Sequence, residues 1–329
     1  METRPVPRAA ARRWCAAIAC LALARLAPAV TAAELPLPAG VEVRRDVPYA
    51  ANANPRQTLD LYLPKERTAG TKLPVIVFIH GGGWVGGNKS SGRAALQGFV
   101  AGGNYAAASV AYRLAGEARW PAQIHDCKAA IRWIRANAAS LGIDGERIAV
   151  MGTSAGGTLA TLLGVSADVA ALEGTVGPHA GTSSRVTCVV NRFGRLDFDA
   201  EPESARAGPS QAKALEGRLT TMFGAPFAER RAAAREGSPI THVSADDPPV
   251  ITLHGTRDEL VPISQAESFD AAARKAGARH LMIRVVNGGH GFDHPEAKRR
   301  ERQFLELHLR GIPATISSEP IVLTPKAPK

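Results

Sequence analysis

The pentapeptide Gly152-Thr153-Ser154-Ala155-Gly156 places a serine between two segments whose patterns predict a strand and a helix. Residues 147–151 form a short apolar run typical of a buried strand, and residues 157–163 are small or apolar, as in a packed helix. A Gly-x-Ser-x-Gly sequence at a strand-to-helix turn presents the serine hydroxyl above a sheet, beside the positive end of the helix dipole. This arrangement predicts acyl transfer through a covalent serine ester.

A glycine run after another predicted strand could supply hydrogen-bond donors to a negative charge. Its residues are His80-Gly81-Gly82-Gly83-Trp84. Successive glycines leave backbone N–H groups able to point into a cavity, where a tetrahedral acyl intermediate needs donors worth roughly 3 kcal/mol each. A phosphate-binding loop is the alternative, but its Lys-Ser pair should enter the helix directly, and Lys89-Ser90 comes later. We therefore predict an oxyanion site made by the N–H groups of Gly82, Gly83 and Ala155.

An acidic residue and a histidine follow Ser154 at positions that suit an acyl-transfer site. Asp258 lies on the loop after a predicted strand, where a carboxylate could hold an imidazole in one tautomer. His290 lies between glycines after the next predicted strand and could approach a serine hydroxyl as general base. Glu259 and His294 are the neighbouring alternatives. The order serine, acid, histidine, with separations of 104 (258 − 154) and 32 (290 − 258) positions, is that of α/β-hydrolases.

These motifs together make the chain similar to a known family. It resembles the α/β-hydrolases of the esterase/lipase group that carry a His-Gly-Gly-Gly motif and are related to hormone-sensitive lipase. Within that group it is most similar to secreted bacterial carboxylesterases and feruloyl-esterase-like proteins. The resemblance covers about residues 41–310 and includes the segments 58–64, 109–113 and 126–133. Thr153 departs from the pattern, because many of these relatives have Asp before the serine.

The resemblance implies hydrolysis of a small-molecule carboxylic ester with no metal or organic cofactor. It makes Ser154 the nucleophile, His290 the general base and then the general acid, and Asp258 the residue that orients His290. The backbone N–H groups named above would bind the oxyanion. Trp84 would line the substrate pocket beside them, or else pack under the loop. Arg113 and Asp126 match family positions that look structural.

The rest of the chain predicts an α/β fold able to position these residues. With 329 residues, 45% of them hydrophobic, and no internal repeat, one large domain over residues 34–311 is expected. Predicted strands alternate with helical patterns, which indicates a mostly parallel, eight-stranded sheet with helices on both faces. Ser154, Asp258 and His290 then follow the carboxyl ends of strands. The predicted strands are 41–47, 58–63, 73–79, 105–112, 147–151, 186–192, 250–253 and 280–286.

Residues 199–247 interrupt the alternation after the sixth strand and form a small, lid-like insertion. The segment is rich in Ala, Arg and Glu, with helical patterns at 211–222 and 227–235. It is much less hydrophobic than the large caps that bind long acyl chains. A partial pocket wall and a preference for short acyl groups are therefore expected, with a plain surface insertion as the alternative.

Both ends of the chain differ in composition from its centre. Residues 1–33 have a basic start, a largely apolar stretch and small residues at the end, which predicts a cleaved signal peptide and an exported, periplasmic or secreted protein. No stable membrane insertion is expected after cleavage. Residues 312–329 contain four prolines and no periodicity, so an extended or disordered tail is predicted. Cleavage would leave Cys127 and Cys188, which are expected to be buried thiols, although a disulfide remains chemically possible after export.

The net charge bears on possible partners. Residues 1–33 hold five Arg and one Glu, so their removal lowers the formal charge from +10 to +6 (35 basic and 29 acidic residues). A basic surface attracts polyanions. Basic and aromatic residues are not interleaved as in single-strand readers, and a nucleic-acid partner is rejected. The oligomeric state stays open.

Other functions fit parts of this pattern. A small-substrate amidase or formamidase, or a peptidase, would use the same three residues. A non-catalytic binding protein of the same fold is less favoured, because such relatives lose the serine or the histidine.

Overall fold

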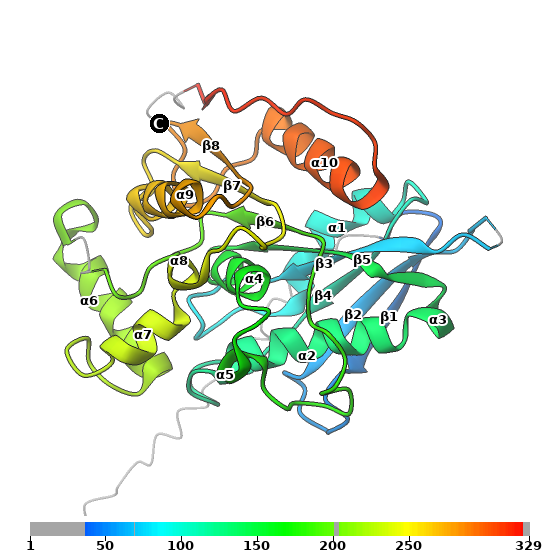
Figure 1. Ribbon diagram of the computed structural model, residues 1–329, viewed down its shortest axis with the longest axis horizontal. Helices are drawn as coiled ribbons and strands as arrows, with labels where there is room; N and C mark the ends of the chain where they lie inside the picture. Colours follow the sequence, from blue (N-terminus) through cyan, green and yellow to red (C-terminus); the bar gives the residue numbers. More distant parts are fainter. Residues whose placement is uncertain (1–36, 69, 201–203, 325–329) are drawn as a thin grey trace, which may run out of the picture. The chain divides into compact units, whose positions relative to one another are not determined.

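The computed structural model describes residues 37–68, 70–200 and 204–324, in which nine strands form one sheet (Figure 1). The predicted signal peptide and residues 325–329 of the predicted tail lie outside the described residues. The strand order is β1-β2-β4-β3-β5-β6-β7-β8-β9. The strands are Val41–Pro48 (β1), Thr58–Pro64 (β2), Leu73–Ile79 (β3), Ala106–Val110 (β4), Ile143–Thr153 (β5), Cys188–Arg192 (β6), Val250–Gly255 (β7), His280–Val286 (β8) and Ile321–Val322 (β9).

The sheet is mostly parallel, as the sequence predicts. Strand β2 pairs antiparallel with β1 and β4, and every pairing from β4 to β9 is parallel. The predicted number of eight strands is one too few, because β9 pairs with β8 through Ile321 and Val322. This strand lies in the segment predicted to be an extended or disordered tail. Two residues among prolines carry no alternating pattern, so only their tertiary pairing defines the strand.

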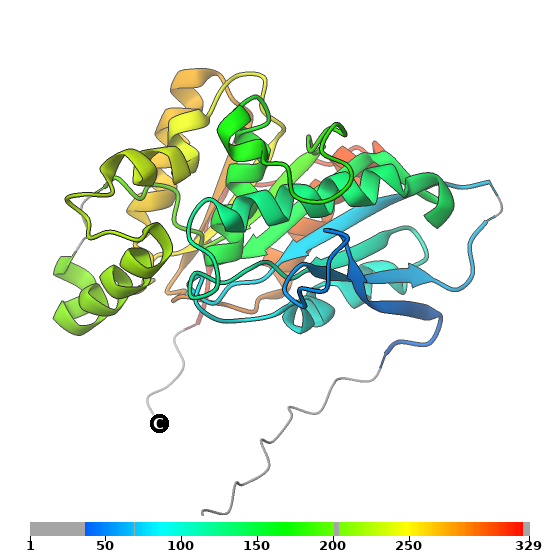
Figure 2. The same ribbon diagram turned by 90° about the horizontal axis from the view of Figure 1, so that it is seen from below.

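Helices cover both faces of the sheet (Figures 1 and 2). Along β3, Val75, Val77 and Ile79 belong to the core that also contains residues of α2, α4 and α9, whereas Ile76 and Phe78 belong to the core that contains residues of α1 and α10. The helices are Gly92–Val100 (α1), Ala122–Ala136 (α2), Ala138–Leu141 (α3), Ala155–Val165 (α4), Ala170–Glu173 (α5), Ser204–Phe223 (α6), Arg231–Gly237 (α7), Pro239–His242 (α8), Ser264–Ala276 (α9) and Pro295–Arg310 (α10), with a 3-10 turn at Lys89–Ser91.

A buried carboxylate ties the loop after β4 to α2. Asp126 is fully buried and accepts hydrogen bonds from the Arg113 backbone N–H (2.9 Å), the Arg113 guanidinium (2.7 and 2.8 Å) and the Gln57 amide (2.7 Å). Its charge is therefore fully compensated. The contact gives both residues the structural position that the resemblance implies.

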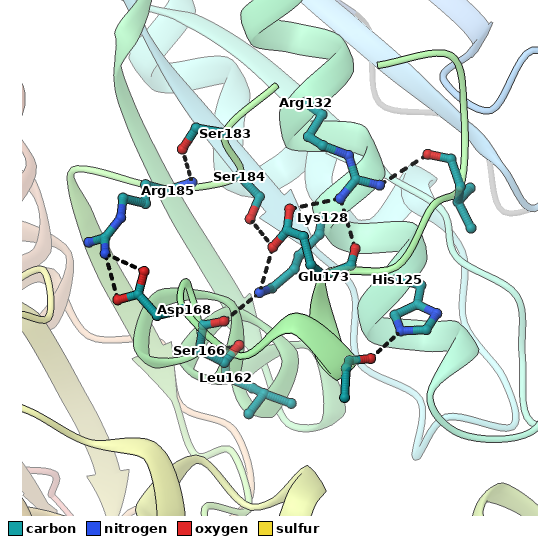
Figure 3. Close-up of polar contacts among 12 residues, drawn as sticks. His125, Lys128, Arg132, Leu162, Ser166, Asp168, Glu173, Ser183, Ser184 and Arg185 are labelled. Atoms are coloured by element: carbon teal, nitrogen blue, oxygen red, sulfur yellow. Dashed lines mark hydrogen bonds and ion pairs between the residues drawn. The ribbon is translucent and has the colours of Figure 1, made fainter. Parts of the chain in front are cut away.

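A second charged network anchors the far end of α4 (Figure 3). The fully buried Lys128 donates to the Ser166 carbonyl, at the end of α4, and to Glu173 (2.6 and 2.9 Å). Arg132, also fully buried, donates to the Glu173 carboxylate at 2.8 Å, and Ser184 donates to it as well. Burial would raise the pKa of Glu173, but its contacts with Lys128, Ser184 and Arg132 outweigh burial and lower the pKa. A cation at the carboxyl end of α4 also complements the helix dipole.

The two cysteines of the described residues are free and buried, as predicted. Cys127 lies in the core on one face of the sheet and Cys188 in the core on the other. Burial raises the pKa of both thiols. In the same part of the chain, no helix is both long enough and apolar enough to cross a bilayer.

Candidate active site

Ser154 occupies a strained turn between β5, which ends at Thr153, and α4, which begins at Ala155. Its backbone angles are φ 53° and ψ −124°, a region that residues other than glycine rarely adopt. The flanking glycines permit the turn: a Cβ atom on Gly152 would lie 2.1 Å from the Gly156 carbonyl oxygen, and one on Gly156 would lie 2.1 Å from that of Ile79. The backbone thus holds the serine hydroxyl beyond the carboxyl end of β5.

The three residues singled out from the sequence meet at this turn. The Ser154 hydroxyl lies 2.8 Å from His290 Nε2, and His290 Nδ1 lies 2.8 Å from Asp258 Oδ2. A carboxylate only accepts, so Nδ1 carries the proton and the Nε2 lone pair accepts from the serine. In this tautomer, the imidazole can remove the serine proton.

The carboxylate of Asp258 is held by several donors at once. Its Oδ1 atom accepts from the backbone N–H groups of Leu260 and Val261, both at 2.9 Å. His254 Nε2 lies 3.4 Å from Oδ2. Burial would raise the pKa of Asp258, but its hydrogen bonds with His254, His290 and the Val261 N–H outweigh burial and lower the pKa well below its usual range. Asp258 therefore stays ionised beside the imidazole.

The neighbouring alternatives lie outside this hydrogen-bonded chain. The side chain of Glu259 is exposed, whereas Asp258 is buried. His294 caps the first turn of α10, where its Nδ1 atom accepts from the Glu296 backbone N–H at 3.2 Å. The structure thus separates both residues from Ser154.

The glycine loop after β3 turns back toward Ser154. Gly82, Gly83 and Trp84 have φ values of 123°, 59° and 62°, and the Gly82 carbonyl accepts from the N–H groups of Val85 and Gly86. Within the described part of the chain, the N–H groups of Gly82 and Gly83 have no hydrogen-bond partner. Gly83 and Ala155 line the same cavity as Ser154, whereas Gly82 is not among the lining residues.

His80 holds the start of this loop. Its ring stacks on Tyr112 with centroids 4.3 Å apart, and its Nδ1 atom donates to the Gly81 carbonyl at 2.7 Å. Burial lowers the pKa of His80 to about 4. The side chain is therefore neutral at neutral pH and serves the loop as a packed, hydrogen-bonded support.

A small cavity opens beside the serine. Its volume is about 150 Å³. Trp84 lines it and also packs edge-on against Phe198 with centroids 5.3 Å apart. Helix α6, which is interrupted at Gly208, contributes one wall. The residues lining the cavity are Gly83, Trp84, Ser154, Ala155, Arg195, Gln211, Ala212, Ala214, Leu215, Arg218, Leu260, Val261, Pro262 and His290.

Comparison with known protein families places the chain in one of them. Residues 59–272 match the BD-FAE family, a stretch of well over half of the 329 residues. The chain belongs to the BD-FAE family. A similar curated protein is the esterase LipC of Mycobacterium tuberculosis, 33% identical over 251 residues that make up 76% of this chain and 60% of LipC. The chain thus spans about 60% of the length of this relative.

Solved structures agree with the BD-FAE assignment. A truncated form of a carbohydrate esterase from gut microbiota is 32% identical with a TM-score of 0.73, over 82% of this chain and 96% of that one. The butyrate-bound esterase Est2 of Thermogutta terrifontis is 28% identical with a TM-score of 0.62, over 82% and 92% of the two chains. These relatives confirm the α/β-hydrolase fold and the resemblance to esterases.

Sequence reasoning missed several residues of this BD-FAE site. Phe193 meets the His290 ring edge-on, with centroids 4.9 Å apart, and so packs against one side of the imidazole. Arg195 and Arg218 line the cavity, yet Arg195 lies in the loop after β6 and Arg218 on α6. None of these residues stands in a motif. Their places depend on how the insertion after β6 folds back toward the sheet, which local patterns do not encode.

Proposed function

We propose that this BD-FAE family chain is a serine carboxylesterase that hydrolyses short-chain or carbohydrate-linked carboxylic esters. The observation that carries the proposal is the continuous hydrogen-bonded chain from Asp258 through His290 to the Ser154 hydroxyl, at the edge of a cavity. This geometry is the one that activates a serine hydroxyl for attack on a carbonyl carbon. The esterase relatives support the same reaction class.

The proposed reaction begins with attack of Ser154 Oγ on the ester carbonyl while His290 Nε2 takes the hydroxyl proton. The negative oxygen of the tetrahedral intermediate accepts from the N–H groups of Gly83 and Ala155, with Gly82 as the third candidate donor. The C–O bond to the alcohol then breaks, and His290 returns the proton to the leaving oxygen. Water, deprotonated by His290, attacks the acyl-serine in the same way and releases the acid.

Two features support a short acyl group. The cavity beside Ser154 has a volume of about 150 Å³, which is small beside the roughly 300–1,000 Å³ of drug-sized ligand pockets. The relative Est2 has been solved with butyrate bound. The carbohydrate esterase among the relatives supports a sugar-linked alcohol portion in the same way.

Initial rates on 4-nitrophenyl acetate, butyrate, octanoate and palmitate test this proposal, with methyl ferulate and a formyl anilide alongside. We expect the largest kcat/KM with acetate or butyrate, and loss of turnover in Ser154→Ala. Ser140→Ala is the matched control, because Ser140 is exposed and its hydroxyl donates only to the Asn137 carbonyl. A maximum at octanoate or beyond would contradict the short-chain preference. Hydrolysis of the anilide alone would favour the formamidase instead.

A further inference from the structure

The cavity beside Ser154 has a positive lining. Two guanidinium groups, those of Arg195 and Arg218, border it together with apolar side chains such as Trp84 and Leu215. No carboxylate is among the described residues that line it. A guanidinium stays protonated at any pH at which the protein is folded, so this charge is permanent.

Arg218 lies directly over the glycine loop. A Cβ atom built on Gly83 would lie 3.0 Å from Arg218 Cδ and 3.1 Å from Arg218 Nη1. The nearest acid on the same helix, Glu216, is engaged elsewhere: it accepts two 2.6 Å hydrogen bonds from Arg230. Within the described part of the chain, no carboxylate forms an ion pair with Arg218. Arg218 is exposed and lines the cavity, so its charge is accessible to a substrate there.

Arg195 adds a second cation at the same cavity. It is only 4% exposed, and one of its nitrogen atoms contacts the Asp197 carbonyl at 3.4 Å. A nearly buried guanidinium that borders a substrate cavity is well suited to bind an oxyanion, because the low local dielectric strengthens the attraction.

We infer that the substrate is an ester that also carries a carboxylate, bound by the guanidinium of Arg218, with Arg195 lining the same cavity. The inference rests on the proposed esterase function and adds a charge to its substrate class. A planar guanidinium and a carboxylate form paired, charge-assisted hydrogen bonds, whereas a neutral ester would give Arg218 no anion. Arg218 is thus a specificity-determining residue. The carboxylate could belong to the acyl portion or to the alcohol portion of the ester.

Two matched pairs of esters separate these sources. Monoethyl adipate and ethyl hexanoate differ only by a carboxylate in place of a methyl group at the end of the acyl chain. 4-Acetoxybutyrate and butyl acetate differ only by a carboxylate in place of a methyl group at the end of the alcohol portion. We expect kcat/KM for the charged member of one pair to exceed that of its neutral partner about tenfold, as one charge-assisted hydrogen bond contributes.

Arg218→Gln should reduce this charged-to-neutral ratio to near one, and added salt should reduce it in the wild type. Lys213→Gln is the matched control: it removes an exposed cation of α6 that does not line the cavity, and it should keep the ratio. Ratios near one in both wild-type pairs would overturn the inference, as would an equal loss for charged and neutral esters in Arg218→Gln. Absence of turnover with every ester would instead overturn the esterase function itself.

Discussion

The Nε2 atom of His254 lies 3.4 Å from Asp258 Oδ2, the same oxygen atom that accepts the 2.8 Å hydrogen bond from His290. His254 Nε2 also donates to the Val261 carbonyl at 2.8 Å, so its proton points toward the loop that carries Asp258. Two imidazoles from different strand ends thus converge on one carboxylate oxygen. Because the Asp258 carboxylate can only accept hydrogen bonds, it fixes the orientation of His290 with Nδ1–H toward Oδ2.

Asp258→Asn should lower kcat by about 10³–10⁴ with little change in KM, because the variant keeps the shape but not the tautomer of His290. The NH₂ group of the asparagine would face either His290 Nδ1 or the backbone N–H groups of Leu260 and Val261. In either orientation, a donor replaces an oxygen atom that accepts a hydrogen bond in the wild type. Steady-state kinetics on 4-nitrophenyl butyrate measure the loss. Asp168→Asn, which removes an exposed carboxylate paired with Arg185, should match the wild type. An active Asp258→Asn enzyme would contradict the assigned role.

The acid limb of the pH profile should report His290. Only the neutral imidazole accepts the serine proton, so kcat/KM should rise with pH as the fraction of neutral imidazole grows. The pKa of Asp258 is lowered well below its usual range by its hydrogen bonds, so this carboxylate stays ionised and does not produce the acid limb. His294→Ala should keep the profile, because His294 only caps α10. A kcat/KM that does not depend on pH, or a pH dependence that disappears in His294→Ala, would exclude His290 as the base.

His80 should titrate near pH 4, because burial lowers its pKa to about that value from the ordinary 6.5. The unfolded chain then binds the proton first as pH falls. Above about pH 6.5, His80 is neutral in both states and the free energy of unfolding is at its full value. As pH falls from about 6.5 to about 4, the free energy of unfolding decreases by roughly 1.4 kcal/mol per pH unit. Imidazole NMR, with His80→Gln to assign the signal, measures the titration. A midpoint near 6.5 would show that the ring is hydrated in the folded protein.

Glu173→Gln should lower the free energy of unfolding by about 3 kcal/mol, because it leaves the buried Lys128 and Arg132 without their anion. Removal of one partner of a buried ion pair ordinarily costs about 3–5 kcal/mol. We expect the lower value because the Glu173 side chain is 26% exposed. Urea denaturation at pH 7 measures the change. The exposed pair of Asp168 and Arg185 offers the control: Asp168→Asn in the same segment should cost less than about 1 kcal/mol. Equal losses in the two variants would refute the anchoring role of this network.

The sequence predicts most of the strands, and the meeting of Ser154, Asp258 and His290 in space, because each has a local signal. The strands β3 and β8 have the predicted bounds, since β3 is a buried apolar run and β8 is apolar apart from His280 and Arg284. Gly152 and Gly156 belong to a motif because no other residue fits their backbone contacts. Asp258 and His290 follow predicted strands, and parallel strands bring their carboxyl ends to one edge.

The sequence predicts a partial pocket wall within residues 199–247, but the exact bounds and orientation of its helices, and strand β9, could not be predicted because long-range contacts define them. The predicted helix 227–235 is observed as Arg231–Gly237, and the helix that lines the cavity extends back to Ser204 across a break at Gly208. Which side of that helix faces Ser154 is set by its packing. Arg218 therefore has no sequence signal that distinguishes it from the other arginines of the chain.

The helix that walls the cavity and the groups that we propose to react come from different stretches of chain. Ser154, Asp258 and His290 follow β5, β7 and β8, whereas α6 is inserted between β6 and β7. A change within the insertion leaves the strand order and these three loops intact. The insertion is thus a separable module: replacing it with the corresponding segment of another esterase should change the wall that α6 contributes, while the loops after β5, β7 and β8 keep the groups that we propose to react.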